Sequence, residues 1–148
     1  MQGSFRVPSN PEALVSANKL GYLVLCDAHG KVAGKDCIYG VFNRIFVGRF
    51  PAMHEMCFLA FELWTTSGDH KLTVRIRNSD NADVVPQLGP LEMKVSAVGQ
   101  ASGAIQLRNL PLEKPGIYSF VVEIDGEAVG ARDLIVEPIP QQGPPRQG

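Results

Sequence analysis

The sequence predicts an all-β protein, an antiparallel β-sandwich of the immunoglobulin-like or fibronectin-like type with seven or eight strands. Short runs of alternating apolar and polar residues recur along the chain, and Gly, Pro, Asn or Asp separates them. No segment sustains the period of a helix. Of the 148 residues, 45% are hydrophobic and 20% are charged, which is enough apolar material for a packed core. We therefore expect one sandwich domain, spanning residues 19–137.

The two ends of the chain depart from the alternating pattern. Residues 1–18 are polar and contain proline, and Asn10 before Pro11 is a favourable cap for one short helical turn. We expect this segment to be a leader to the domain. Residues 138–148 are rich in Pro, Gln and Gly, so they are expected to form a disordered tail.

The first two strands are separated by a turn-forming stretch. Alternation begins at Leu20, and residues 27–30 are expected to form a turn that ends the first strand. Residues 37–47 are rich in Ile, Tyr, Val and Phe and are expected to form one continuous second strand. We expect Cys26 and Cys37 to pack in the core, although a hairpin would also allow them to face each other.

A hairpin is predicted in the middle of the chain, because residues 65–68 form a short turn-like stretch between two alternating segments. If Thr65 lies opposite Gly68, one side of this hairpin is almost wholly apolar and includes Cys57, Leu59 and Val74. The other side combines aromatic, Met and Arg side chains, which are enriched at protein interfaces. This candidate interface consists of Met56, Phe58, Trp64, Arg75 and Arg77. Alternatively, the leader or the C-terminal tail covers it.

Two short strands follow, at residues 91–95 and 104–110, and then a Pro- and Gly-containing corner at residues 110–116. The corner leads into the last part of the domain.

A final hairpin is predicted around Asp125-Gly126, a dipeptide suited to a tight turn. Leu134 and Val136 would fall on the wrong face of this hairpin in an ideal register. We therefore expect a β-bulge near Gly130 that returns them to the core.

Asn43 and Arg44 form a candidate polar site, because they interrupt an otherwise apolar strand. One interpretation is a bulge or an edge-strand position with Arg44 in water. The other is a guanidinium held among Phe42, Phe46 and Phe50, where it takes a carboxylate or the backbone of a partner.

Composition and motifs argue against several function classes. There are 14 basic and 15 acidic residues, which disfavours nucleic-acid binding. Apolar runs are too short to cross a membrane. The three histidines have no metal-ligand spacing, and no nucleophile and base pattern is present, so we expect no metal, no cofactor and no enzymatic activity. Three cysteines in unpatterned spacing are typical of reduced thiols in the cytoplasm.

Three segments carry a family resemblance: residues 24–28 (VLCDA), residues 39–46 (YGVFNRIF) followed by Phe50-Pro51, and residues 115–120 (PGIYSF) continuing to Asp125-Gly126. Together they resemble a family of short bacterial proteins of unknown function that are single-domain β-sandwiches. The resemblance spans about residues 22–136. It implies a cytoplasmic bacterial protein with a sandwich fold, and it carries no activity, cofactor or catalytic residue.

We therefore expect a non-enzymatic module that binds a protein partner, or a second copy of itself, through a sheet face or an edge strand. One alternative is a small-ligand or carbohydrate-binding module that uses Trp64 and Tyr39 as a stacking platform. A hydrolase whose site is built from distant loops is a further alternative.

Overall fold

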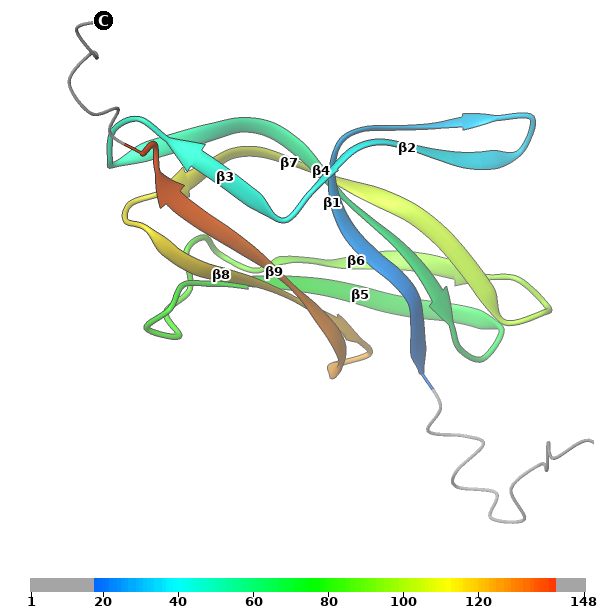
Figure 1. Ribbon diagram of the computed structural model, residues 1–148. Helices are drawn as coiled ribbons and strands as arrows, with labels where there is room; N and C mark the ends of the chain where they lie inside the picture. Colours follow the sequence, from blue (N-terminus) through cyan, green and yellow to red (C-terminus); the bar gives the residue numbers. More distant parts are fainter. Residues whose placement is uncertain (1–17, 141–148) are drawn as a thin grey trace, which may run out of the picture.

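The computed structural model describes residues 18–140, and these residues form two β-sheets without a helix (Figure 1). The all-β fold predicted from the alternation is therefore confirmed. In chain order the strands are β1 (Lys19–Val32), β2 (Lys35–Phe42), β3 (Arg44–Val47), β4 (Ala52–Trp64), β5 (Gly68–Arg77), β6 (Leu88–Val95), β7 (Gln100–Leu112), β8 (Gly116–Ile124) and β9 (Glu127–Pro138). The expected helical turn near Pro11 lies outside the described residues. The expected tail, residues 138–148, lies outside them from residue 141 onward; Pro138 still belongs to β9, and the Ile139 amide donates a hydrogen bond of 3.0 Å to the Val47 carbonyl.

The first sheet has the strand order β2-β1-β4-β7, and the second has the order β3-β9-β8-β5-β6. Neighbouring strands are antiparallel except β3 and β9, which are parallel. The expected antiparallel pairing therefore holds for all neighbours but this one, whereas the expected number of seven or eight strands is wrong. The described residues form nine strands because the run at residues 37–47 divides into two.

The hydrophobic core lies between the two sheets. It is built from alternate residues whose side chains face inward from each strand, as the two-residue period of a β-strand requires. Leu59 of β4, Val74 of β5 and Phe120 of β8 are completely buried there. The sequence alternation thus identifies the inner faces correctly.

The hairpin predicted between β4 and β5 is wrong. β4 lies between β1 and β7 in the first sheet, whereas β5 lies between β8 and β6 in the second. Residues 65–67 therefore carry the chain from one sheet to the other. The apolar sides of the two strands do meet, but they meet across the core rather than side by side. The same alternation suits both arrangements, so it does not determine which strands are neighbours.

The turn between β1 and β2 lies at Ala33-Gly34, both of which have positive φ angles, and not at residues 27–30. β1 pairs with β4 only as far as Cys26 and continues as a hairpin with β2. We call residues 27–42 the hairpin arm; it is drawn in blue at the upper right of Figure 1.

The three cysteines remain free thiols. Cys26 lies opposite Val41, so it does not face Cys37. Cys26 and Cys57 are buried as expected, whereas Cys37 is only half-buried.

The second predicted strand breaks at Asn43, where the chain leaves the first sheet and enters the second. The Asn43 carbonyl accepts a hydrogen bond of 2.8 Å from the Ile135 amide of β9. Because Asn43 and Arg44 lie at this crossing, both remain exposed and neither has to be buried.

The final hairpin agrees with the sequence prediction. Asp125 and Gly126 form its turn with φ angles of 51° and 84°. The register shifts between Val122, which lies opposite Gly130, and the next residue, which lies opposite Ala128. This irregularity confirms the predicted bulge near Gly130, and it brings Leu134 opposite Tyr118 on the buried side.

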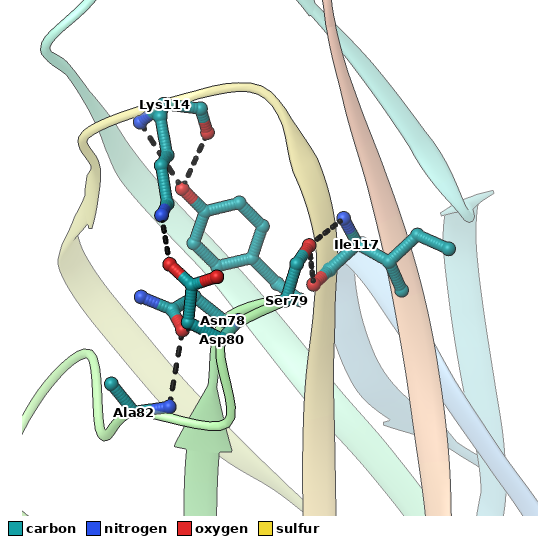
Figure 2. A network of polar contacts seen from close by, with 7 residues as sticks. Asn78, Ser79, Asp80, Ala82, Lys114 and Ile117 are labelled. Atoms are coloured by element: carbon teal, nitrogen blue, oxygen red, sulfur yellow. Dashed lines mark hydrogen bonds and ion pairs between the residues drawn. The ribbon is translucent and has the colours of Figure 1, made fainter.

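A polar network fixes the corner between β7 and β8 to the loop that follows β5 (Figure 2). The Ser79 hydroxyl accepts a hydrogen bond from the Ile117 amide at 3.0 Å and donates one to the Ile117 carbonyl at 3.2 Å. Lys114 of the corner pairs with Asp80 of the loop. The Tyr118 hydroxyl donates a hydrogen bond of 2.7 Å to the Lys114 carbonyl, so β8 is tied to the corner that precedes it.

Candidate functional site

The structure does not bring the residues of the candidate interface together. Met56, Phe58 and Trp64 belong to the outer side of β4 in the first sheet. Arg75 and Arg77 belong to β5 in the second sheet and alternate with core residues. The two groups therefore lie on opposite outer faces, and the predicted single mixed face is wrong because the hairpin on which it rested does not form.

The two arginines have ordinary partners within the second sheet. Arg75 Nε lies 2.9 Å from Glu123 Oε2, and Arg77 Nε lies 3.5 Å from Asp83 Oδ1. Partly exposed pairs of this kind satisfy the charge without requiring a partner protein.

The β4 residues are also partly satisfied by the protein itself. Trp64 Nε1 donates a hydrogen bond of 2.8 Å to Glu62 Oε1, and Gln106 Nε2 donates to Met56 Sδ at 3.0 Å. Phe58 is half-buried and lies opposite Cys26, which in turn lies opposite Val41 of the hairpin arm. The outer face of β4 is therefore continuous with the hairpin arm.

Among residues 18–140, β2 and β3 each have one side without a partner strand; the chain changes sheets at Asn43 between them, and Gly40 within β2 has a φ angle of 67°. Within the part of the chain that the structure describes, β2 pairs only with β1, and β3 pairs only with β9. We call residues 35–47 the free edge. Its large apolar side chains are well exposed, at 56% for Tyr39, 55% for Val41 and 50% for Phe46.

Asn43 and Arg44 lie in the middle of the free edge. Arg44 Nε is 3.6 Å from Glu137 Oε2 of β9, and both side chains are about half exposed. Phe42 and Phe50 instead pack against the core, and the Phe42 ring lies 5.9 Å from the His54 ring. The structure therefore places Arg44 on an edge strand beside Glu137, and it places Phe42 and Phe50 against the core.

The other outer strands carry features that discourage strand addition. β6 contains Pro90 and the charged residues Glu92 and Lys94. β7 contains Pro111, and Asn109 interrupts its regular backbone with a φ angle of 53°. The free edge contains no proline, its irregularities are Gly40 and the crossing at Asn43, and its charged residues lie mainly at the arm's tip and at Arg44. It is therefore the edge with the fewest features that oppose strand addition.

The tip of the hairpin arm is held against β7. The Ser102 hydroxyl donates a hydrogen bond of 2.7 Å to Asp36 Oδ2, and His29 Nε2 lies 3.3 Å from Asp36 Oδ1. The hydrogen bond from Ser102, together with the nearby Lys31, lowers the pKa of Asp36 below its ordinary value. The arm is thus anchored at its far end as well as at its base.

Sequence reasoning missed a linked group of Thr66, His70 and Asp125. His70 Nδ1 lies 2.6 Å from Asp125 Oδ2, while His70 Nε2 lies 2.8 Å from the Thr66 carbonyl and 3.2 Å from the Thr66 hydroxyl. The hydrogen bond to Asp125 raises the pKa of His70, and the bonds from the Lys71 amide and from His70 lower the pKa of Asp125.

In composition this group resembles a catalytic triad of nucleophile, base and orienting acid. Its histidine, however, does not have the free acceptor nitrogen that the base of a triad needs. Both ring nitrogens of His70 face oxygen acceptors, so the ring is best satisfied as an imidazolium with two N–H donors. An imidazolium cannot take a proton from Thr66. The group therefore links the β4–β5 crossing to the β8–β9 turn, and no signal in the sequence connects residues that are 55 positions apart.

Residues 18–140 contain no group of three or more His, Cys, Asp or Glu residues arranged to hold a metal ion. They also contain no helix that is long and apolar enough to cross a membrane.

Among solved structures, the alkylpurine DNA glycosylase AlkC of Pseudomonas fluorescens, bound to DNA containing an abasic site analogue, is similar to this chain. Its TM-score is 0.55 at 15% sequence identity, and the match covers 81% of this chain and 30% of the glycosylase chain. The chain thus spans less than a third of that protein. The similarity concerns the fold alone.

A β-glucosidase of Listeria innocua matches with a TM-score of 0.47 at 11% identity, over 82% of this chain and 16% of the glucosidase. The sensor domain of the anti-sigma factor RsgI4 of Pseudobacteroides cellulosolvens matches with a TM-score of 0.37 at 9% identity, over 64% of this chain and 95% of the sensor domain.

A search of curated protein sequences finds no match to this chain. A family model described as "Family of unknown function (DUF6941)" matches residues 21–137, which is most of the chain and nearly the whole sandwich. The resemblance to a family of unknown function is confirmed, and the chain belongs to the family DUF6941.

Proposed function

We propose that this protein is a non-enzymatic interaction module that binds an extended segment of a partner protein by strand addition at the free edge. The observation that carries the proposal is the edge itself, in which an unpaired backbone coincides with Tyr39, Val41 and Phe46, each at least half exposed. Unpaired amide and carbonyl groups supply affinity for another strand, and exposed side chains on alternate positions supply specificity.

Arg44 gives this edge a chemical preference. Its guanidinium is half exposed, and its nearest carboxylate, that of Glu137, stands 3.6 Å away rather than in close contact. A carboxylate on an incoming strand can therefore share the guanidinium without breaking a buried pair. The proposed partner segment is extended and apolar, with an acidic residue near its centre.

We also infer that the sandwich is of the immunoglobulin-like kind. The orders β1-β4-β7 and β9-β8-β5-β6 match two sheets of that fold when β1, β4 and β5 are taken as its first three main strands. Tyr118, at the start of β8, bonds back to the Lys114 carbonyl, as in the tyrosine corner of such domains. We propose a cytoplasmic location, with which three free thiols are compatible.

Selection of peptides from a random linear library on the immobilised protein tests the proposal. We expect the wild-type protein to enrich apolar peptides with a central acidic residue. We also expect the bound peptide to slow hydrogen exchange of amides in residues 35–47. Val41→Lys should abolish enrichment, because edge lysines oppose strand pairing.

Val98→Lys is the matched control, since Val98 is 79% exposed and lies outside the free edge. It should retain the selected peptides. Equal binding by both variants, or slowed exchange at β6 or β7 instead, would contradict the proposal. Loss of a wild-type dimer in Val41→Lys, without peptide selection, would assign the edge to a second copy of the chain.

A further inference from the structure

β3 presents two side chains of different chemistry on the outer face of the second sheet. Its alternate residues Ile45 and Val47 belong to the core or pack against it. Arg44 and Phe46 therefore point to the opposite side, as the two-residue period of a strand requires, and both are exposed. A cationic group and an apolar group thus stand two positions apart on a strand at the edge of the sheet.

Both side chains remain available to a partner strand. Phe46 is 50% exposed. The Arg44 side chain is also half exposed, and its Nε lies 3.6 Å from Glu137 Oε2. On the β9 side, Arg44 lies opposite Ile135 and Phe46 lies opposite Glu137. On the other side of β3, no strand of the described chain supplies a cross-strand neighbour to either residue.

The apolar surface at Phe46 continues past the end of β3. Gly48 has no side chain, and a Cβ there would lie 3.6 Å from Ile139 Cδ1. The Ile139 amide donates a hydrogen bond of 3.0 Å to the Val47 carbonyl, and the Ile139 side chain is 56% exposed. Exposed apolar side chains thus lie at and beyond the end of β3, whereas the exposed positive charge of Arg44 lies at its beginning.

We propose that the partner segment carries an apolar residue two positions before an acidic residue, and that it adds to β3 in the antiparallel direction. This inference rests on the strand addition proposed above. Antiparallel pairing is slightly more stable per residue than parallel pairing, and it reverses the order of opposing residues. The apolar residue then lies opposite Phe46 and the acidic residue opposite Arg44, and cross-strand pairs of both kinds stabilise a sheet.

Binding of synthetic peptides to the immobilised protein tests this order. Three pools of short peptides contain a central Glu and one Leu, and their other positions are random but lack acidic and large apolar residues. The Leu stands two positions before the Glu, two positions after it, or three positions before it. Only the first pool places Leu opposite Phe46 in an antiparallel strand. It should bind about fivefold more tightly than either other pool, which corresponds to about 1 kcal/mol and is typical of a strong cross-strand pair.

Variants assign the preference to β3. Phe46→Thr removes the ring but keeps a β-branched side chain suited to a strand, so the preference for the first pool should fall below about twofold. Arg44→Gln should remove the preference for Glu over Gln at the centre of first-pool peptides. Ile117→Thr is the matched control, since Ile117 is 51% exposed but lies on β8, away from the free edge. It should bind all pools like the wild type. Should Phe46→Thr not fold by thermal unfolding, Phe46→Ser replaces it.

Equal binding of the three pools, or tighter binding of the second or third pool, would overturn this inference. So would a preference that Phe46→Thr leaves unchanged. If the bound peptides still slow hydrogen exchange in residues 35–47 in these cases, strand addition itself stands. Failure of every pool and of the random library to bind would instead contradict strand addition, and this inference with it.

Discussion

His70 shows how one side chain can join two distant turns. It contacts Thr66 at the crossing between the sheets and Asp125 at the last turn of the domain. The Asp125 carboxylate also accepts a hydrogen bond of 2.8 Å from the Lys71 amide. Two of its acceptor positions are therefore occupied, which explains why a non-glycine residue is held at a φ angle of 51° there.

The His70 link should make stability depend on pH. The raised pKa of His70 means that its contribution is fully present below the ordinary histidine pKa of about 6.5 and is lost as pH rises through the higher folded value. The lowered pKa of Asp125 means that its contribution is lost as pH falls through its folded value, below about 3.9. The link is therefore strongest between these limits.

We expect His70→Gln to lower the free energy of unfolding by about 1 kcal/mol at pH 5.5, and by less at pH 8.5. Urea unfolding at both pH values measures this difference. A loss that is equal at both pH values, or larger at pH 8.5, would show that the imidazolium does not make the link.

The Tyr118 hydroxyl should also stabilise the folded protein, through its hydrogen bond to the Lys114 carbonyl. Tyr118→Phe removes the hydrogen bond to the Lys114 carbonyl while keeping the buried ring, so it should cost about 1 kcal/mol in urea unfolding. Tyr39→Phe is the matched control, because the Tyr39 side chain is more than half exposed. It should change the free energy of unfolding by less than about 0.5 kcal/mol. Equal effects of the two substitutions would contradict a structural role for the Tyr118 hydroxyl.

At the scale of elements, the hairpin arm depends on its contact with β7. Removing the Asp36 carboxylate with Asp36→Asn should weaken the hydrogen bond from Ser102 and loosen the tip. Hydrogen exchange of amides in residues 29–39 should become faster, while exchange in β8 stays unchanged. Asp133→Asn on the exposed side of β9 is the control. Unchanged exchange in the arm would show that β-pairing with β1 alone holds it.

The turn before β7 should tolerate no side chain at Gly99. Gly99 has a φ angle of 80°, and a Cβ there would collide with the Thr65 carbonyl oxygen, which is backbone and cannot move aside easily. Gly99→Ala should therefore destabilise by more than about 1 kcal/mol. Gly34→Ala is the control, since Gly34 has a similar φ of 76° but open space around it. Thermal unfolding should show the larger loss for Gly99→Ala, and the reverse order would refute the collision.

The alternating pattern predicted which side chains are buried better than it predicted which strands are neighbours. Leu59 and Val74 were placed on apolar sides correctly, because alternation is a local property of each strand. Their strands were placed in one hairpin wrongly, because pairing depends on how the whole chain packs. Gly130 is the exception. The alternation before and after the last turn put Leu134 on the wrong face, and this conflict correctly indicated the bulge.

The same distinction explains the site predictions. Arg44 lies on an edge strand, which was one of its two interpretations, and adjacent polar residues suggested it because they conflict with burial on either face. The combination of Phe58 with Arg75 failed because it required a particular strand neighbour. The link between His70 and Asp125 requires β5 and the β8–β9 turn to meet, and the sequence shows no pattern that joins them.

At the scale of the whole molecule, the second sheet ends in two different strands. β3 ends it on one side and β6 ends it on the other. β3 belongs to the free edge, whereas β6 contains Pro90 and the charged residues Glu92 and Lys94. Strand addition is therefore expected on one side of the molecule only.

The crossing at Asn43 has a consequence for any strand that binds along residues 35–47. Such a strand would form backbone hydrogen bonds to β2 in the first sheet and to β3 in the second, and would thereby connect the two sheets. The sheets could then separate only after the bound strand dissociates. Occupancy of the edge should therefore raise the melting temperature, and the increase should grow as the peptide concentration exceeds Kd.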